Sequence, residues 1–296
     1  MQKLLPLFLL LFGLNTVAQN YQQAFKAALG KNDTAKALSI INEWEKADPN
    51  DPELYTAAFN FYLYSSEQTN IVLEQEQQGQ QSIPITDSTG KTAGYINTKK
   101  GYNPAKVAKG FQYINRGIAL YPNRLDMRWG KCYVLGLLAD YDNFTNEVIA
   151  ALQCSDSIKC KWLWTNNQTP ANPQAEMLDA VHAYMKQLYN TQKDELLVNM
   201  QRIGEVALFY YPNQIEIITT TSVTYMLTGN NAKALHYLKR AEKLNPKDFI
   251  VLNNMARCYE LMRNKANALK YYQLAAKYGD AQAKELAKQK MKELKR

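Results

Sequence analysis

The chain has 296 residues, of which 46% are hydrophobic, and a formal net charge of +8 at pH 7. This hydrophobic fraction is enough for a large core, and the low counts of 13 glycines and 10 prolines favour helices over a turn-rich β architecture. The four cysteines include no CxxC pair, so neither a zinc site nor a thioredoxin-like redox site is indicated.

The first 18 residues have the organisation of a signal peptide. Residues 4–14 form an apolar run, and small residues precede a predicted cleavage between Ala18 and Gln19. The run is too short to cross a membrane comfortably, and an N-terminal anchor or a buried helix is the alternative. No cysteine follows it, so we expect an exported protein, periplasmic or secreted, that is not a lipoprotein. The Val17-Ala18-Gln19 junction resembles those of exported Bacteroidetes proteins.

Residues 19–64 have the apolar periodicity of helices, and residues 65–103 interrupt it. The interruption begins with a Gln- and Glu-rich segment, residues 67–81, which predicts an extension of the preceding helix. Residues 83–96 then contain two β-prone runs around a glycine-bearing turn. These runs predict a small inserted β-hairpin, with a disordered loop as the alternative. Helical periodicity returns in residues 104–152.

A second interruption, residues 153–173, predicts an irregular segment at an edge of the fold. It contains Cys154 and Cys160, separated by a polar stretch. Export permits disulfides, so these two cysteines are candidates for a bridge, although spacing alone does not establish one. Trp162 and Trp164 lie in the same segment, where they either fill the core or form part of a contact surface.

Residues 174–279 contain the clearest internal repeat. Residues 215–248 and 249–282 align without gaps, and each reads as two helices separated by a short polar turn. The Lys-rich residues 280–296 predict a terminal helix that caps the last repeat. The aligned positions, each separated by 34 residues, are Tyr225 with Tyr259, Ala234 with Ala268, Leu238 with Tyr272, and Ala241 with Ala275.

The repeat has the spacing of a known family. Ala234, Leu238, Ala241 and Pro246 stand where tetratricopeptide repeats have a small residue, a large apolar residue, an alanine and a proline. The chain therefore resembles the tetratricopeptide repeat (TPR) family. The resemblance implies an all-α fold, a right-handed superhelical solenoid of TPR-type helix pairs, into which the β-hairpin is inserted. An unrelated all-α bundle is the alternative.

The resemblance also implies a function. A solenoid of this kind presents a concave surface, lined by the first helix of each pair, on which a peptide or protein can lie. We therefore expect a non-enzymatic interaction module or scaffold of the cell envelope, in an envelope-associated complex, with a protein or peptide partner of unknown identity. The candidate residues of the concave face are Asn60, Tyr64, Trp129, Tyr133, Asn253, Arg257 and Glu260.

The sequence gives little support to catalysis or cofactor binding. His182 and His236 lack metal-ligand spacing with each other or with cysteine. Gly90-Lys91-Thr92 lacks the glycine that a phosphate-binding loop requires five positions earlier, where Ile85 stands. We therefore expect no cofactor, no metal and no enzymatic activity.

The sequence also restricts which classes of partner we expect. Export argues against nucleic acid as the partner of the basic surface, and no run after the signal peptide is long enough to span a membrane. The alternative function is glycan or small-ligand binding in a groove built on Trp129, Trp162 and Trp164.

Overall fold

A computed structural model describes residues 11–79 and 82–295, with side-chain surroundings from residue 20 onward. The first ten residues of the predicted signal peptide therefore lie outside the described residues. The chain divides into two compact units. Unit 1 extends to Met127 and includes Thr165–Asn167, and unit 2 contains Arg128–Trp164 and the chain from Gln168 onward.

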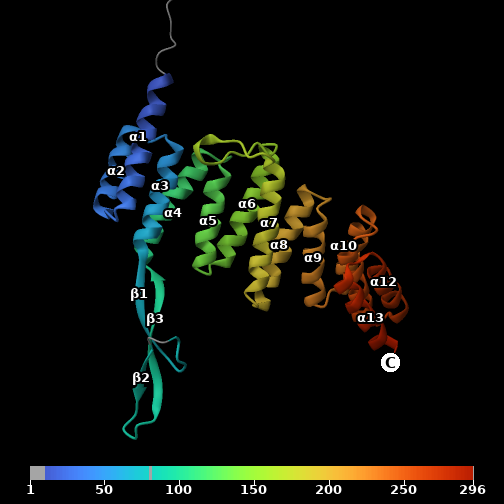
Figure 1. Cartoon of the computed structure of the whole chain (residues 1–296). Helices are drawn as coiled ribbons and strands as arrows, with labels where there is room; N and C mark the ends of the chain where they lie inside the picture. Colours follow the sequence, from blue (N-terminus) through green and yellow to red (C-terminus); the bar gives the residue numbers. More distant parts are fainter. Residues whose placement is uncertain (1–10, 80–81, 296) are drawn as a thin grey trace, which may run out of the picture. The chain divides into compact units, whose positions relative to one another are not determined.

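Unit 1 is built from two helix pairs and a β insertion (Figure 1). Helix α1, Leu11–Gly30, packs against α2, Thr34–Ala47, and α3, Pro52–Ser66, packs against α4, Pro104–Leu120. The predicted cleavage site falls within α1. Trp44 of α2 is fully buried, and its indole nitrogen donates a hydrogen bond of 2.9 Å to Asp51, the residue that caps α3.

The insertion joins α3 to α4 and extends away from them as a narrow ribbon, which we call the arm (Figure 1). It consists of β1, Glu67–Glu74, β2, Ile83–Thr86, and β3, Thr92–Tyr102, in the spatial order β1-β3-β2. The predicted hairpin is confirmed as β2 and β3. The predicted helix extension was wrong, because residues 67–74 form a strand that pairs antiparallel with residues 95–102.

Unit 2 is a succession of helices (Figure 1). The boundary between the units falls within α5, so most of this helix belongs to unit 2. The helices are α5 Leu125–Leu137, α6 Tyr141–Ser157, α7 Pro173–Asn190, α8 Leu197–Tyr210, α9 Ile215–Leu227, α10 Asn231–Leu244, α11 Phe249–Leu261, α12 Lys265–Tyr278 and α13 Ala281–Lys295, with short 3-10 turns at Thr165–Asn167 and Asp194–Leu196.

The turn inside most helix pairs follows one local pattern. A residue with positive φ ends the first helix, and an Asp or Asn directly after it caps the second helix by accepting a backbone N–H. The capping oxygen satisfies a donor that has no partner within the helix. The positive-φ residues and their caps are Asn32 with Asp33, Ala139 with Asp140, Gly229 with Asn230, and Arg263 with Asn264.

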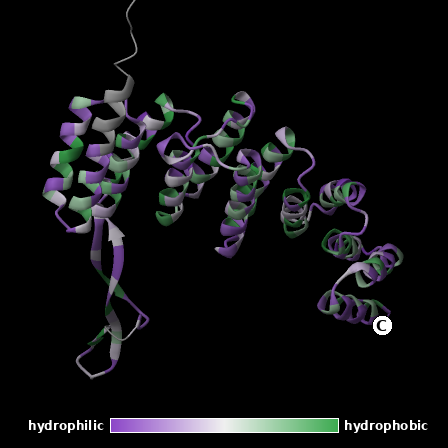
Figure 2. Cartoon of the chain, turned by 45° about the horizontal axis from the view of Figure 1, so that its top comes forward, coloured by the Kyte–Doolittle hydropathy of each residue, from purple (hydrophilic) through white to green (hydrophobic). Residues whose placement is uncertain are grey.

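The predicted 34-residue repeat is visible in the packing of α9 to α12. Ala234 and Ala268 are completely buried. The ring of Tyr225 stacks on Tyr237 at 5.9 Å, and Tyr259 stacks on Tyr271 in the same way at 5.5 Å. Figure 2 shows that hydrophobic and hydrophilic residues alternate along the helices, as expected when one side faces a core. The predicted fold class, an array of helix pairs with a small β insertion, is confirmed.

The predicted irregular segment is shorter than expected, since α6 continues to Ser157 and α7 begins at Pro173. Trp162 is fully buried and donates a hydrogen bond of 3.0 Å to the hydroxyl of Ser155. The candidate bridge between Cys154 and Cys160 is not present in the structure, where all four cysteines are thiols. The Sγ of Cys160 instead lies 3.3 Å from the hydroxyl of Tyr211.

A buried network of ion pairs lies in the core of unit 1. The side chain of Arg124 is fully buried and forms a two-pronged hydrogen-bonded pair with Asp126, with distances of 2.8 and 2.7 Å. It also pairs with Glu53 of α3 at 2.8 Å. The backbone N–H of Asn166 donates to the same Glu53 carboxylate, so the network also holds the 3-10 turn against α3.

We expect Arg124→Ala to destabilise the protein by about 3–5 kcal/mol, because it leaves two largely buried carboxylates without their cation. The control is Arg116→Ala. Arg116 pairs with Glu45 at 3.5 Å with its side chain 54% exposed, so its loss should cost no more than about 1 kcal/mol. Urea denaturation of both variants measures the difference. Equal losses would show that the Arg124 network contributes no more than a surface pair.

Candidate functional site

The predicted concave-face residues lie on three helices. Asn60 and Tyr64 stand one turn apart on α3, both exposed, and the hydroxyl of Tyr64 donates a hydrogen bond of 3.1 Å to Asn32. Tyr133 of α5 is 60% exposed. Trp129, one turn before it, is buried at 8% exposure and packs edge-on against Tyr184, so it belongs to the core and not to a contact surface.

The remaining three predicted residues lie on α11. Arg257 is exposed, whereas Asn253 and Glu260 are half-buried. Glu260 accepts a hydrogen bond of 2.7 Å from the hydroxyl of Tyr272 on α12, and its carboxylate is therefore already engaged within the repeat. Among the described residues, no hydrogen bond or ion pair joins the sets on α3, α5 and α11 to one another. Asn60 and Tyr64 belong to unit 1, and the other five predicted residues belong to unit 2.

A better-defined recess lies in unit 2 between two first helices, α7 and α9, over a floor supplied by α8. We call it the α7–α9 pocket. It has a volume of about 430 Å³. A second hollow, of about 440 Å³, continues it across α7 and shares Lys186 and Asn190 with it. The pocket is lined by His182, Lys186, Tyr189, Asn190, Met200, Thr219, Thr220 and Val223.

Helix geometry explains how the pocket obtains its polar wall. His182, Lys186 and Asn190 are spaced four residues apart on α7, so they lie one above another on one side of the helix. The facing wall is α9, which presents Thr220 and its neighbours. The two walls meet where the imidazole Nε2 of His182 lies 3.0 Å from the hydroxyl of Thr220.

The charge in the lining of the pocket is positive. None of its lining residues is acidic, and Lys186 is exposed and forms no ion pair within the described part of the chain. Burial lowers the pKa of His182, and the neighbouring Lys186 lowers it further. Glu216 and Asp179 oppose this shift but do not reverse it. A free cation, hydroxyls and an amide in one recess are suited to bind a carboxylate.

The sequence analysis missed this pocket. It applied the groove positions to α3, α5 and α11 but not to α7, whose repeat pattern is weak. The signal that could have found it is the stripe of His182, Lys186 and Asn190, which places three polar side chains on one face of a predicted helix.

The structure also bears on the alternative of a tryptophan-lined ligand groove. Trp162 is completely buried, and Trp129 is 8% exposed. Trp164, with 39% exposure, is the one of the three with a substantial exposed surface. The three side chains therefore do not form an exposed platform on which a sugar ring could stack.

Two further properties of the described residues concern membrane insertion and metal binding. No helix among them is both long and apolar enough to cross a membrane. They also contain no group of three or more His, Cys, Asp or Glu side chains placed to hold a metal ion.

The fold and the pocket define a helical-repeat protein whose first helices carry an open recess. No family model matches the sequence, and no curated protein matches it. Solved structures similar to the chain include YrrB, described as a TPR protein with an unusual peptide-binding site, at 13% identity and a TM-score of 0.41, covering 84% of this chain and 97% of that one.

Two other similar structures are those of PilW and pilF. PilW, a type IV pilus biogenesis factor, is 14% identical with a TM-score of 0.38, covering 91% of this chain and 98% of that one. The pilF protein of Pseudomonas aeruginosa is 11% identical with a TM-score of 0.37, covering 93% and 98%.

We expect the stability of the protein to depend on the protonation of His182. Its pKa in the folded state lies below the ordinary value of 6.5, so the unfolded chain takes up the proton first as the pH falls. The stabilisation is present above pH 6.5 and is lost as the pH falls through the folded-state pKa.

The variant His182→Asn removes this titration and keeps a polar side chain opposite Thr220. Thermal melts between about pH 7.5 and pH 5 should show the wild type losing stability relative to the variant only in the acidic part of the range. A constant difference across the range would contradict the shift.

Proposed function

We propose that this protein is a non-enzymatic interaction scaffold of the cell envelope, which holds an extended acidic segment of a partner protein in the α7–α9 pocket. The observation that carries the proposal is the cationic, hydroxyl-lined recess between two first helices, with no acidic residue in its lining. The partner is therefore a polypeptide that brings at least one carboxylate to Lys186.

Each wall of the pocket has a part in this binding. Lys186 pairs with a carboxylate of the bound segment, and protonated His182 adds a second cation at acidic pH. Asn190 and Thr219 offer donors and acceptors to an extended backbone. Val223 supplies apolar surface for a neighbouring side chain, so the pocket suits a segment in which acidic and apolar residues lie close together.

The geometry of the pocket favours binding over catalysis. His182 and Thr220 form a hydrogen bond, which superficially suggests an activated hydroxyl. In a Ser-His-Asp triad, a carboxylate also orients the histidine. Within the described residues His182 makes no hydrogen bond to a carboxylate, so nothing holds its ring as a base.

The partner segment can be identified by photo-crosslinking in the native host. A photoreactive phenylalanine analogue at Tyr189, which lines the pocket and is 51% exposed, should crosslink to the partner. The same analogue at Phe209 of α8, which is 78% exposed and does not line the pocket, is the control. Crosslinking that is equal at both positions, or absent at Tyr189, would contradict the assignment of the pocket.

We expect Lys186→Gln to weaken binding of a short peptide of alternating Glu and Val by about tenfold, because a charge-assisted hydrogen bond contributes roughly 1.5 kcal/mol. Lys239→Gln, which removes an exposed lysine of α10, should leave the affinity unchanged. Fluorescence anisotropy of the labelled peptide measures both, with a Lys-Val peptide as a charge-reversed probe. Equal affinity for the two peptides would sink the proposal of an acidic partner.

Export is the second part of the proposal, and it rests on the apolar run and the Ala18–Gln19 junction. We expect the protein isolated from the cell envelope or the medium of its native host to begin at Gln19, without a lipid modification. N-terminal sequencing and the intact mass of that protein measure this. A native protein that retains residues 1–18, or that is found in the cytoplasm, would contradict export and leave the pocket proposal untouched.

A further inference from the structure

The arm has one strongly apolar face that nothing in the described residues covers. Residues directly opposite each other in antiparallel strands share a face of the sheet. Leu73 lies opposite Ile96, and Ile83 lies opposite Ile96 from the other side. Ile71 and Leu73 are 75% and 73% exposed, and Ile83 is 60% exposed. The face comprises Ile71, Leu73, Ile83, Ile85 and Ile96.

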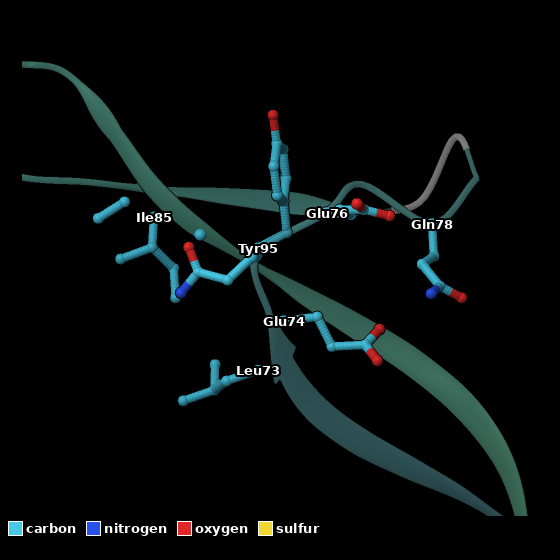
Figure 3. A pocket seen from close by; sticks show the side chains of 9 residues that line it. Leu73, Glu74, Glu76, Gln78, Ile85 and Tyr95 are labelled. Atoms are coloured by element: carbon cyan, nitrogen blue, oxygen red, sulfur yellow. The ribbon is translucent and has the colours of Figure 1, made fainter.

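The opposite face of the arm is polar, and the chain that follows β1 covers part of it. Between β1 and β2 the chain crosses β3 at Asn97, which is 1% exposed. The amide of Asn97 donates to Glu74 and to the backbone oxygen of Glu76, and it accepts from the backbone of Gln78. Figure 3 shows this division, with Leu73 and Ile85 on one side and the side chains of Glu74, Glu76 and Gln78 extending on the other.

The edges of the arm differ in how well they are protected against pairing with another strand. Proline, irregular pairing and lysines all discourage strand addition at an edge. On the β2 side, β2 carries Pro84 and a shift of register after Ile85. On the other side, β1 pairs regularly over all of Glu67–Glu74 and has no proline, lysine or register shift.

We propose that β1 is a self-association edge, at which two copies of this chain join antiparallel around a two-fold axis at Ile71. In this register Ile71 lies opposite Ile71 of the second copy. Leu73 then lies opposite Thr69, Val72 opposite Asn70, and Gln68 opposite Glu74. No two like charges face each other, and the apolar faces of the two arms become one continuous surface.

The protection of the other edge favours a second copy over an open-ended assembly. Joining two arms at β1 gives the strand order β2-β3-β1-β1-β3-β2, in which the β2 sides lie outermost. Each outer edge then carries Pro84 and the register shift, so association closes at a dimer. The central stretch of β1, from Gln68 to Leu73, is uncharged, which suits a strand that pairs with itself.

The two-fold register makes a sharp crosslinking test of the full chain possible. Opposite Cα atoms in antiparallel strands lie about 4.5–5.5 Å apart, within the range of a disulfide. Ile71→Cys should therefore give disulfide-linked dimers under mild oxidation. Ile83→Cys, on the protected side of the arm, is the matched control, and the wild type with its four cysteines gives the background.

Sedimentation velocity of the uncrosslinked protein provides the second measurement. The wild type should show a reversible dimer at high protein concentration, and Ile71→Lys should lose it, because it places two lysines opposite each other. Ile71 is 75% exposed, so this variant should fold normally, which circular dichroism verifies.

Three outcomes would overturn the proposal. The wild type could remain monomeric, Ile83→Cys could crosslink as well as Ile71→Cys, or Ile71→Cys could crosslink in the native host to a different protein only. The last result would assign the edge to a foreign strand. None of these outcomes affects the α7–α9 pocket, which lies in unit 2.

Discussion

The fold depends on helices that approach so closely that side chains are excluded where they meet. At Gly117 of α4, an added Cβ would lie 2.7 Å from the Cβ of Tyr55 on α3, which is shorter than real carbon contacts. At Gly204 of α8, it would lie 2.1 Å from the hydroxyl oxygen of Thr221 on α9. Close backbones leave room for large rings beside the contact, such as the stacked Tyr62 and Tyr113.

The same constraint decides which residues are available for binding. Each first helix must bury one face against its own partner and another against the neighbouring pair, so only a narrow stripe remains open. On α7, core residues such as Met185 and Leu188 are completely buried. The residues left on the open stripe, His182, Lys186 and Asn190, therefore define the chemistry of the pocket.

Features that depend on local sequence were predicted correctly. Features that depend on contacts between distant segments were not. The 34-residue period of α9 to α12 and the turn before β3 are local patterns, and both were predicted. Residues 67–81 are rich in Glu and Gln, which favour a helix, but residues 67–74 pair with residues 95–102 and form a strand. Trp129 was expected at the surface because its position on the helix was known, but Tyr184 covers it.

The arm belongs to unit 1 and the α7–α9 pocket to unit 2, so the two proposals are independent of each other. Their combination nevertheless has a consequence for affinity. A dimer joined at β1 carries two α7–α9 pockets, one in each copy. If both proposals hold, a partner with two acidic segments would bind the second pocket at an effective concentration set by the first contact. Such avidity would compensate for a modest affinity at one pocket, as expected for an open recess with one free lysine.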